Sequence, residues 1–365
     1  MVRKTANMIL LMAGVFLASQ VTALSQTGDP EEIIKSTPAR VITIAAVGDI
    51  MLGTSYPSTA FLPPAGNLAP LFGALADTLA AAGIAFGNLE GCFLNYGDPV
   101  KKCRDSLNCY LFRTPESYSG MLADAGLDIV SLANNHIGDF GDPGRKKTKY
   151  LLDSLGINYA GLTEKPWAIF ERDSLKIGFC AFAPNSGTVS LLKTDEAAAI
   201  VRFLNDTCDI VIVSFHGGAE GADNQRVPRT TEYHVGEDRG DVYLFARLMI
   251  DNGADVVFGH GPHVTRAIDL YKDRFIAYSL GNFLTYSRFN ITGPNALAPI
   301  AAITVDSAGR FVSGRIIPGY QIKGVGVRYD TEKRAIKKIR ELIALDFPDS
   351  LISLSDEGVI TYKKP

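Results

Sequence analysis

Side chains that can bind a metal ion or hydrogen-bond a substrate stand directly after a series of short apolar runs. These runs read IAAVG, IAFG, VSLA, IVIVSF, DVVFG and AYSLG. The polar residues that follow them are Asp49, Asn88, Glu90, Asn134, Asn135, His136, His216, His260, His263 and Asn282. In open α/β sheets the ligand crevice lies beyond the carboxyl ends of the strands, so we expect these side chains to converge on one site.

The histidines are concentrated at these positions. The chain has five, and only His234 lies elsewhere, in a polar segment where we expect it at the surface. One buried histidine is most simply a hydrogen-bonded core residue, but four at the ends of apolar runs point to a metal. Imidazole, carboxylate and amide ligands suit Mn, Fe, Zn or Mg at a hydrolytic centre. One or two divalent ions are predicted; a pair about 3.5–4 Å apart would hold a phosphoryl or acyl group and supply a hydroxide.

The apolar runs are predicted to be strands buried on both faces. They are short, rich in β-branched or aromatic residues, and cover 41–48, 84–89, 127–133, 176–183, 208–215, 254–259 and 274–281. Helix-like segments alternate with them at 68–82, 116–125, 144–155, 194–205 and 241–252. This alternation predicts a layered α/β fold. Beyond residue 298 the pattern predicts two alternating strands and then a charged amphipathic helix at 331–345.

Length, charge and the first residues indicate organisation and location. The chain has 365 residues and a net charge of -3 without a sustained basic run, so nucleic acid is not an expected partner. Residues 1–23 have the pattern of a signal peptide or an N-terminal anchor, and 24–40 that of a linker, which predicts a periplasmic or other extracytoplasmic protein. Cys103 and Cys109 bracket a loop that a disulfide can close, with Cys92 as an alternative partner.

A set of motifs carries a family resemblance. AVGDIMLG, FGNLEG, VSLANNHIGDFG, VSFHGGAE, DVVFGHGPHVTRAID and IAYSLGNFL, in this order, resemble blocks of the bacterial capsule-synthesis protein CapA family, which is associated with poly-γ-glutamate synthesis. That family is similar to calcineurin-like metallophosphoesterases. The resemblance therefore implies an α/β fold, a four-layer α-β-β-α sandwich over residues 41–320. Residues 321–365 are then a C-terminal extension that packs on the core.

The resemblance also implies roles for individual residues. The metal ligands it implies are Asp49, Glu90, Asn135, His216, His260 and His263. Asn135 and His136 match the Asn-His pair at the catalytic centre, where the histidine stabilises the leaving group or the transition state. Two positions depart from the phosphoesterase pattern: Met51 replaces a histidine, and GNLEG offers Asn88 and Glu90 in place of a bridging aspartate. A rearranged or single-metal centre is therefore an equal alternative.

The predicted substrate-binding residues are Asn88, Arg226, Arg229 and Asn282. The two arginines lie in the long segment between His216 and Asp241, which can cover the site and bind an anionic substrate bidentately. For either arginine taken alone, a solvated loop is the simpler interpretation.

The predicted function follows from these expectations. We expect an exported, metal-dependent and hydrolase-like protein that acts in synthesis, release or attachment of an anionic capsule-type polymer such as poly-γ-glutamate. Membrane-bound components of a polymer synthase are its expected partners. One alternative is a secreted metallophosphoesterase or nucleotidase that acts on phosphate esters. Another is a non-catalytic accessory protein of a polymer synthase.

Overall fold

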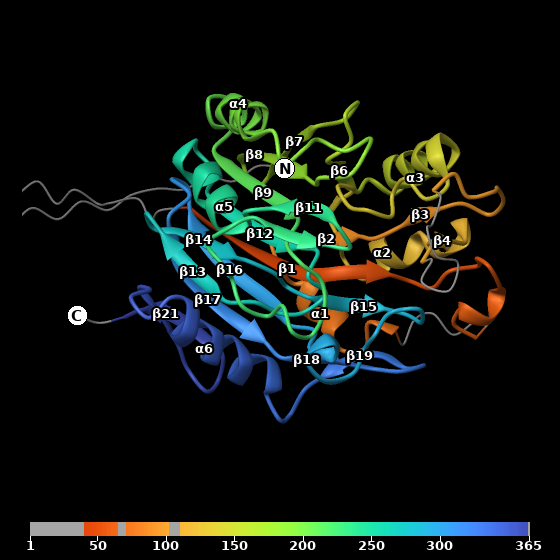
Figure 1. Ribbon diagram of the computed structural model, residues 1–365. Coiled ribbons are helices and arrows are strands. Elements are labelled where there is room, and N and C mark those ends of the chain that lie inside the picture. The colour runs from red at the N-terminus through yellow and green to blue at the C-terminus, as the bar shows by residue number, and fades with distance from the viewer. Residues whose placement is uncertain (1–39, 65–70, 102–109, 364–365) are drawn as a thin grey trace, which may run out of the picture. The chain divides into compact units, whose positions relative to one another are not determined.

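A computed structural model of the chain describes residues 40–64, 71–101 and 110–363 (Figure 1). The predicted signal peptide or anchor, the linker up to residue 39, and Cys103 and Cys109 lie outside these ranges. Cys92, the alternative disulfide partner, is a buried free thiol. Within the described ranges, no helix is long and apolar enough to cross a membrane.

The larger sheet has nine strands and carries β1 at its centre. Its strands run in the order β20-β21-β17-β16-β1-β2-β5-β6, and β15 pairs with the end of β1. The strands on the β2 side and β15 are parallel to β1, and β16 is antiparallel to it. Their bounds are β1 (Val41–Met51), β2 (Ile84–Leu89), β5 (Ile129–Ser131), β6 (Asn158–Ala160), β15 (Asn282–Thr285), β16 (Ile300–Asp306), β17 (Phe311–Ile317), β20 (Ile352–Leu354) and β21 (Val359–Tyr362).

The second sheet has six strands in the order β13-β14-β12-β9-β8-β7. The inner strands β8, β9, β12 and β14 run parallel, and the two edge strands are antiparallel to their neighbours. Their bounds are β7 (Trp167–Arg172), β8 (Leu175–Phe182), β9 (Ile210–His216), β12 (Val256–His260), β13 (Ile268–Tyr271) and β14 (Arg274–Ala277). Because β9 and β12 run in the same direction, the histidines that end them lie at the same edge of the sheet.

Helices and small two-stranded ladders complete the described part of the chain. The helices are α1 (Leu75–Ala80), α2 (Gly120–Asp124), α3 (Gly141–Leu155), α4 (Thr194–Asn205), α5 (Val242–Asp251) and α6 (Arg334–Asp346). The short ladders pair β3 (Cys92–Phe93) with β4 (Arg113–Thr114), β10 (Glu232–His234) with β11 (Glu237–Gly240), and β18 (Gly319–Ile322) with β19 (Gly326–Tyr329). Short 3-10 helices occur at Thr59–Phe61, Glu116–Tyr118 and Gly293–Ala296.

The two sheets pack face to face through an apolar core. Alternate residues of β1 point to opposite faces, so that Ile44 is buried in the core shared with the second sheet and Ala45 in the core on the other face. In the shared core, the ring of Phe86 from β2 stacks on Phe258 from β12 with ring centroids 5.4 Å apart. The sheets are thereby fixed against each other close to the strand ends that carry the polar residues.

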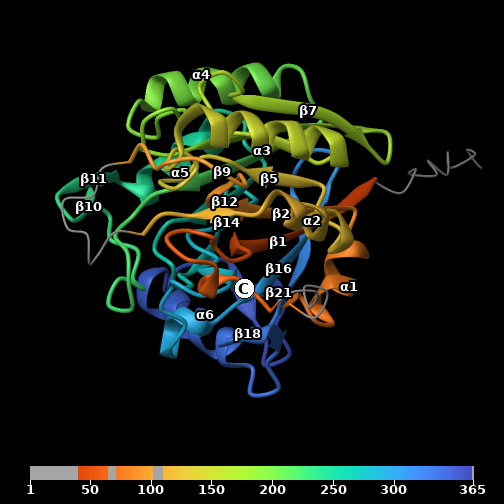
Figure 2. The same ribbon diagram turned by 90° about the vertical axis from the view of Figure 1, so that its right-hand side faces the viewer.

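Helices cover the two outer faces of the paired sheets. Leu79, Leu122 and Leu152 from α1, α2 and α3 are buried in the core on the outer face of the larger sheet. Val201 from α4 and Phe245 from α5 are buried with the six-stranded sheet. Figure 2 shows α5 on one side of β12 and β14, and α1 and α2 on the far side of β1 and β2. The predicted four-layer α-β-β-α sandwich is confirmed.

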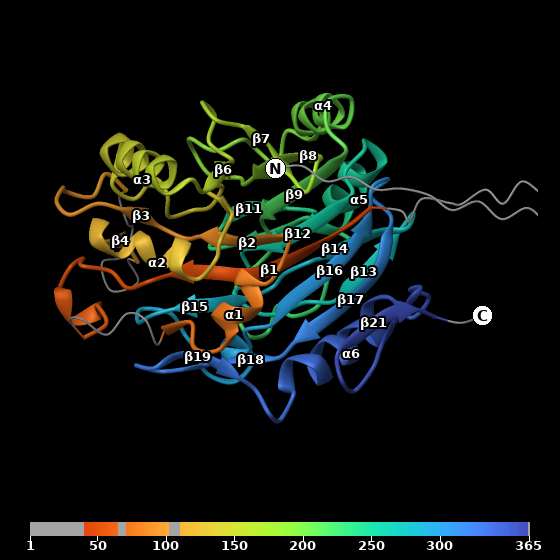
Figure 3. The ribbon, with the colours of Figure 1, turned by 180° about the vertical axis from the view of Figure 1, so that it is seen from behind.

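Some predicted elements are shorter than their sequence patterns. The helix expected at 68–82 begins at Leu75, because Gly73 has a φ of +54°, which a right-handed helix does not allow. The helix expected at 116–125 is divided into a 3-10 turn and α2. The segment after residue 320 adds β19 to β18 and β21 to β17, and Figure 3 shows α6 beside β17 and β21. Ile336 and Ile339 of α6 are buried in the core with Ile316 and Ile360.

Candidate metal centre

Close packing at the end of β1 fixes the first carboxylate. Asp49 is fully buried and pairs in register with Asn88 of β2 and Asn282 of β15. The preceding residue, Gly48, lies so close to the turn before β15 that a Cβ atom there would stand 2.0 Å from the carbonyl oxygen of Gly281. A residue without a Cβ is therefore required before Asp49, and it allows the two backbones to approach.

Side-chain amides hold the two carboxylates together. Asn88 Nδ2 donates to Asp49 Oδ1 at 2.8 Å and to Glu90 Oε2 at 3.1 Å. Asn134 Nδ2 in turn donates to Asn88 Oδ1 at 3.1 Å. Asn134 Oδ1 also accepts from the backbone N–H groups of His136 and Ile137 and thereby holds the turn. Because Asn88 uses both ends of its amide inside the cluster, we assign it to positioning the carboxylates rather than to the predicted contact with substrate.

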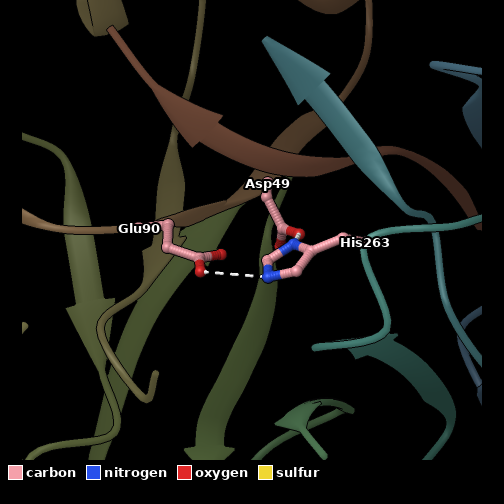
Figure 4. A group of neighbouring side chains, drawn as sticks. All are labelled: Asp49, Glu90 and His263. Atoms are coloured by element: carbon pink, nitrogen blue, oxygen red, sulfur yellow. Dashed lines mark hydrogen bonds and ion pairs between the residues drawn. The ribbon is translucent and has the colours of Figure 1, made fainter. Parts of the chain in front are cut away.

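His263 brings an imidazole to both carboxylates. It follows β12, has a φ of +57°, and places Nδ1 2.8 Å from Asp49 Oδ2 and Nε2 3.6 Å from Glu90 Oε1 (Figure 4). One ligand atom from each of these three residues lies within 4.8 Å of the others, a spacing that suits a single metal ion. The backbone carbonyl of His263 accepts from Asn282 Nδ2 and Asn295 Nδ2 at 3.2 and 3.1 Å. Asn282 therefore holds the loop of His263, in place of the predicted contact with substrate.

His216 and His260 stand side by side at the ends of β9 and β12. The two residues pair in register, and both are fully buried. His260 Nδ1 lies 3.3 Å from Asp49 Oδ1, and the His216 ring centroid lies 6.3 Å from that of His263. None of the four ring nitrogens has a hydrogen-bond partner among the described residues. Buried polar groups in proteins almost always have a partner, so these imidazoles indicate a missing one.

The electrostatics of the cluster are those of a site that attracts a cation. Burial alone would raise the pKa of Asp49, but the close imidazoles of His260 and His263 hold it well below its usual range. Burial and the charge of Asp49 raise the pKa of Glu90. Burial opposes the protonation of His263, but Glu90, Asp49 and Glu220 together raise its pKa to about 10. The surrounding carboxylates thus favour a positive charge at His263.

The donor set fits a divalent ion. Besides the imidazole nitrogens, the partnerless buried atoms in the described part of the chain include Glu90 Oε1, Asn135 Oδ1 and Asn282 Oδ1. Carboxylate and amide oxygens with imidazole nitrogens are ligands for Mn, Fe, Zn or Mg. Met51, which stands in the place of a phosphoesterase histidine, is buried, and its sulfur accepts from the backbone N–H of Gly53 at 3.2 Å. That corner of the cluster has no imidazole.

His136 lies beside the cluster and is oriented by a carboxylate that the sequence analysis did not single out. Its Nδ1 lies 2.8 Å from Asp139 Oδ2, which also accepts from the backbone N–H of Phe112 at 2.8 Å. The ring of Phe112 covers the imidazole at a centroid distance of 4.1 Å. His136 Nε2 lies 4.0 Å from Glu90 Oε1. Burial lowers the pKa of His136 despite the charge of Asp139.

A cavity of about 280 Å³ opens onto this group. His136 and His263 line it, and Phe112 and Phe289 supply stacked aromatic walls with ring centroids 4.9 Å apart. The residues that line the whole cavity are Tyr110, Phe112, His136, Glu220, Gly221, His234, His263, Arg288, Phe289, Asn290 and Asn295. Its location makes it the candidate substrate pocket, since small ligands bind in concave sites with a few convergent polar groups.

Sequence reasoning missed several residues of this cavity, among them Glu220 and His234. Glu220 lies 3.8 Å from His263 Nε2 and is paired with the buried guanidinium of Arg239 at 3.0 Å. Its place four residues after His216 was a usable signal. His234 was expected at the surface, but it lines the cavity, half-buried, with Nε2 3.3 Å from Glu220 Oε2. It comes from β10 of a separate small ladder, so no pattern of parallel strand ends could have placed it.

Arg226 and Arg229, predicted to bind substrate, are not brought to this cavity. Arg226 contacts the carboxylate of Asp346 and donates to the backbone carbonyl of Leu345, at the end of α6. Arg229 Nη2 donates to the backbone carbonyl of Asp346 at 3.4 Å, and its guanidinium lies 4.9 Å from the ring centroid of Tyr243. Both arginines anchor their segment to the C-terminal helix, and we correct their predicted role accordingly. A different arginine, Arg288, lines the cavity.

Asn135 lies on the far side of the same turn. Its side-chain oxygen is buried without a partner among the described residues, as a metal ligand would be before metal binds. Asn135 does not line the cavity of His136, however, but a second and separate cavity. Its assignment as a ligand therefore stays a prediction.

Comparison with known sequences gives a consistent result. A family model described as bacterial capsule synthesis protein PGA_cap matches residues 43–287. A capsule biosynthesis protein CapA from Bacillus anthracis is 26% identical over 316 residues, which cover 81% of this chain and 71% of that protein. A PGA biosynthesis protein CapA from Bacillus subtilis (strain 168) is 27% identical over 294 residues, which cover 76% and 72%.

Comparison with solved structures gives weaker similarities. A hypothetical protein from Thermus thermophilus matches with a TM-score of 0.44 and 16% identity, covering 76% of this chain and 99% of that one. The NAD nucleotidase of Haemophilus influenzae matches with a TM-score of 0.42 and 12% identity, covering 85% of this chain and 56% of that one.

Proposed function

Because the chain belongs to the bacterial capsule synthesis protein PGA_cap family, we propose that it acts in synthesis, release or attachment of an anionic capsule-type polymer such as poly-γ-glutamate. The family match confirms the resemblance inferred from the sequence motifs. Within the proposed function, the protein is a metal-dependent hydrolase. It works outside the cytoplasm, in keeping with the signal-like pattern of residues 1–23.

One observation carries the hydrolase proposal: buried carboxylates and imidazoles from both sheets meet at one point, and several of their polar atoms have no hydrogen-bond partner among the described residues. Asp49, Glu90 and His263 form the compact part of this group, and His216 and His260 border it with unpaired nitrogens. These residues, with Asn135, are the proposed ligands of one or two divalent ions. A divalent ion at such a site acts as a Lewis acid and makes a bound water more acidic.

The residues of the chain itself supply positioning and proton transfer. His136 lines the cavity, and Asp139 accepts from its Nδ1–H, so Nε2 is the nitrogen that faces a substrate. That nitrogen accepts a proton when the ring is neutral and donates one to a leaving group when it is protonated. The aromatic walls of Phe112 and Phe289 give the cavity an apolar side against which a substrate can pack.

Metal analysis combined with a substrate panel tests the proposal. The purified full chain, handled without chelators, is expected to carry about one or two divalent ions per chain. It is expected to cleave γ-glutamyl peptides. His136→Ala should lower turnover by about 100-fold or more and leave the metal content unchanged, because this histidine transfers a proton without binding the ion. A protein that binds no metal, or that keeps full turnover in this variant, contradicts the proposal.

A second function is favoured by the Asn135-His136 pair, which matches the phosphoesterase pattern. A secreted phosphoesterase or nucleotidase would turn over phosphate esters in the same panel and lose that activity in His136→Ala. The absence of an imidazole at Met51 argues against it. A third outcome, metal binding without turnover of either class, would instead indicate a non-catalytic accessory role, and a relative from Mycobacterium tuberculosis is named as a probable polyglutamine synthesis accessory protein.

A further inference from the structure

A second polar cavity, of about 360 Å³, adjoins the turn that carries His136. Its lining residues are Val100, Lys101, Asn134, Asn135, Gly138, Arg145, Asn185 and Ser186. Among the described residues none lines both cavities, but Asn135 and His136 are consecutive, so the turn that carries them lies between the two spaces. A ligand in the second cavity would therefore lie next to the candidate metal centre without entering it.

Two cationic side chains, Lys101 and Arg145, line this cavity. Lys101 Nζ donates to the backbone carbonyl of Asn135 at 3.2 Å and lies 3.4 Å from Asp139 Oδ1. Arg145, in the first turns of α3, donates through Nη2 to Asp142 Oδ1 at 2.9 Å. The Asp142 side chain is 72% exposed, so this ion pair is weak and solvent-screened. The guanidinium can exchange it for a ligand carboxylate.

Two glycines leave the space in which the guanidinium lies. A Cβ atom at Gly138 would stand 3.0 Å from Arg145 Nη1, and one at Gly187 would stand 3.3 Å from the same atom. Both contacts are at the lower limit for a side chain. A Cβ atom at either position would displace the guanidinium by a few tenths of an ångström, so the two glycines leave it room at the cavity.

Asn185, which also lines this cavity, has an unpaired hydrogen-bond acceptor. Asn185 Oδ1 is buried and has no hydrogen-bond donor among the described residues. The backbone carbonyl of Asn185 is already used, accepting from Thr188 Oγ1 at 2.6 Å, so the side-chain oxygen is the group still without a partner. A buried amide oxygen without a donor is unfavourable, and an N–H group of a ligand would satisfy it.

From this arrangement we propose that the second cavity binds a carboxylate-bearing, amide-linked chain, such as a γ-linked glutamyl segment. The carboxylates pair with Lys101 and Arg145, and an amide N–H donates to Asn185 Oδ1. A phosphate group at neutral pH offers chiefly acceptors, so it would leave Asn185 unpaired. The inference rests on the proposed function and deepens it: the cavity is a subsite that holds the acidic chain beside His136.

The carboxylate of Asp139 links the two sites. Asp139 accepts from the His136 ring through Oδ2 and pairs with Lys101 through Oδ1. The lysine that would bind a substrate carboxylate is therefore attached to the carboxylate that orients the histidine. The side chain of Asp139 therefore links Lys101 in the subsite to His136, the residue to which we assign proton transfer.

Titration calorimetry of the full chain with a γ-linked tetraglutamate tests the inference. Lys101→Gln and Arg145→Gln are each expected to weaken binding about tenfold, which is the effect of losing one charge-assisted hydrogen bond. Lys146→Gln removes the same charge one residue along α3, where the side chain is exposed, and should change affinity less than about twofold. Asn185→Ala is expected to weaken the tetraglutamate and to leave binding of inorganic phosphate unchanged.

Three results would overturn the inference. They are unchanged affinity in both Lys101→Gln and Arg145→Gln, an equal loss in Lys146→Gln, and displacement of the tetraglutamate by an equal concentration of inorganic phosphate. Thermal unfolding of each variant shows that a loss of binding is not a loss of fold.

The same measurements separate this inference from the proposed function. If the protein carries no metal and cleaves nothing, but the two variants still lose tetraglutamate binding, the subsite stands and the hydrolase proposal fails. If the protein cleaves γ-glutamyl peptides and both variants bind the tetraglutamate normally, the subsite fails and the hydrolase proposal stands.

Discussion

The two sheets contribute different chemistry to the candidate metal centre. The larger sheet delivers oxygen ligands from the ends of β1 and β2, and they are held by a network in which Asn88 bridges Asp49 and Glu90. The six-stranded sheet delivers imidazoles from β9 and β12, and His216 and His260 have no hydrogen-bond partner in the described part of the chain. Hydrogen bonds within the protein therefore hold the carboxylates in place, whereas these two imidazoles have no hydrogen-bond partner among the described residues.

The difference indicates what a bound ion would contribute. Hydrogen bonds between amides and carboxylates pre-organise the oxygen side, so little rearrangement is needed when an ion arrives. The imidazoles of His216 and His260 lose their hydrogen bonds to water when they are buried and form none with the described residues, which costs free energy on folding. Metal binding would offset that cost. The comparison therefore predicts that substitutions on the two sides have different consequences with and without metal.

The largest expected effect comes from Asp49, the residue that contacts both sides. Asp49→Ala removes a proposed ligand that lies next to His260 and is hydrogen-bonded to His263, and should weaken metal binding by about 100-fold or more. Metal content after dialysis measures it, with the exposed Asp77→Ala as a control that should keep the ion. If Asp49→Ala retains stoichiometric metal, the two sides do not meet at a metal.

The second effect concerns the stability of the metal-free protein, in which substitutions on the carboxylate side and on the imidazole side should have different costs. Asn88→Leu leaves two buried carboxylates without their shared donor and should lower the free energy of unfolding by about 1–3 kcal/mol. His216→Leu removes a buried imidazole that has no partner, so its cost should be far smaller or absent. Urea unfolding in the presence of a chelator gives both values. The reverse order would show that the imidazole side is the one stabilised without metal.

The third effect is a pH dependence. The pKa of His263 is raised to about 10, so below that pH a metal ion must displace its proton, and metal affinity should rise by up to about tenfold per pH unit. For the metal-free fold the sign is opposite: the contribution of protonated His263 is fully present below pH 6.5 and is lost as the pH rises through about 10.

Metal titrations between pH 6 and 9 measure this dependence. His263→Gln should flatten it, whereas His234→Gln, which changes a histidine outside the compact cluster, should leave the slope nearly intact. A metal affinity that is independent of pH in the unsubstituted protein would contradict the assignment of His263 as a ligand.

The smallest effect is expected far from the centre. Arg226→Gln removes the partner of Asp346 and should lower the free energy of unfolding by about 0.5–1 kcal/mol, since the guanidinium is half-exposed. Metal content and turnover should be unchanged. A loss of turnover without a loss of stability would restore the predicted role of Arg226 in substrate binding.

Local patterns were sufficient for the fold class and for part of the site. The alternating apolar runs predicted a layered α/β fold, whereas the two packed sheets were implied by the family resemblance. The positions after those runs include Asp49, Glu90 and His263, which the structure brings together. Long-range contacts explain the failures. Arg226 contacts a carboxylate that is 120 residues away in sequence, and no local pattern connects the two. Asn88 lies near the end of β2 as expected, whereas Asn282 begins β15, and the amides of both residues turn toward protein groups.

The sequence by itself determined which chemical groups stand at the ends of which strands. Glycine before Asp49, the turn of Asn134 to His136 and the histidines after β9 and β12 are local facts, because each depends on a few neighbouring residues. Only the tertiary structure decided that oxygens and imidazoles from different sheets face one another. It also brought Glu220 and His234 to the cavity and placed Lys101 and Arg145 beside it. The physical reason is that the distance between the sheets is set by the side chains packed between them, such as Phe86 against Phe258, and not by any of the residues that carry the chemistry.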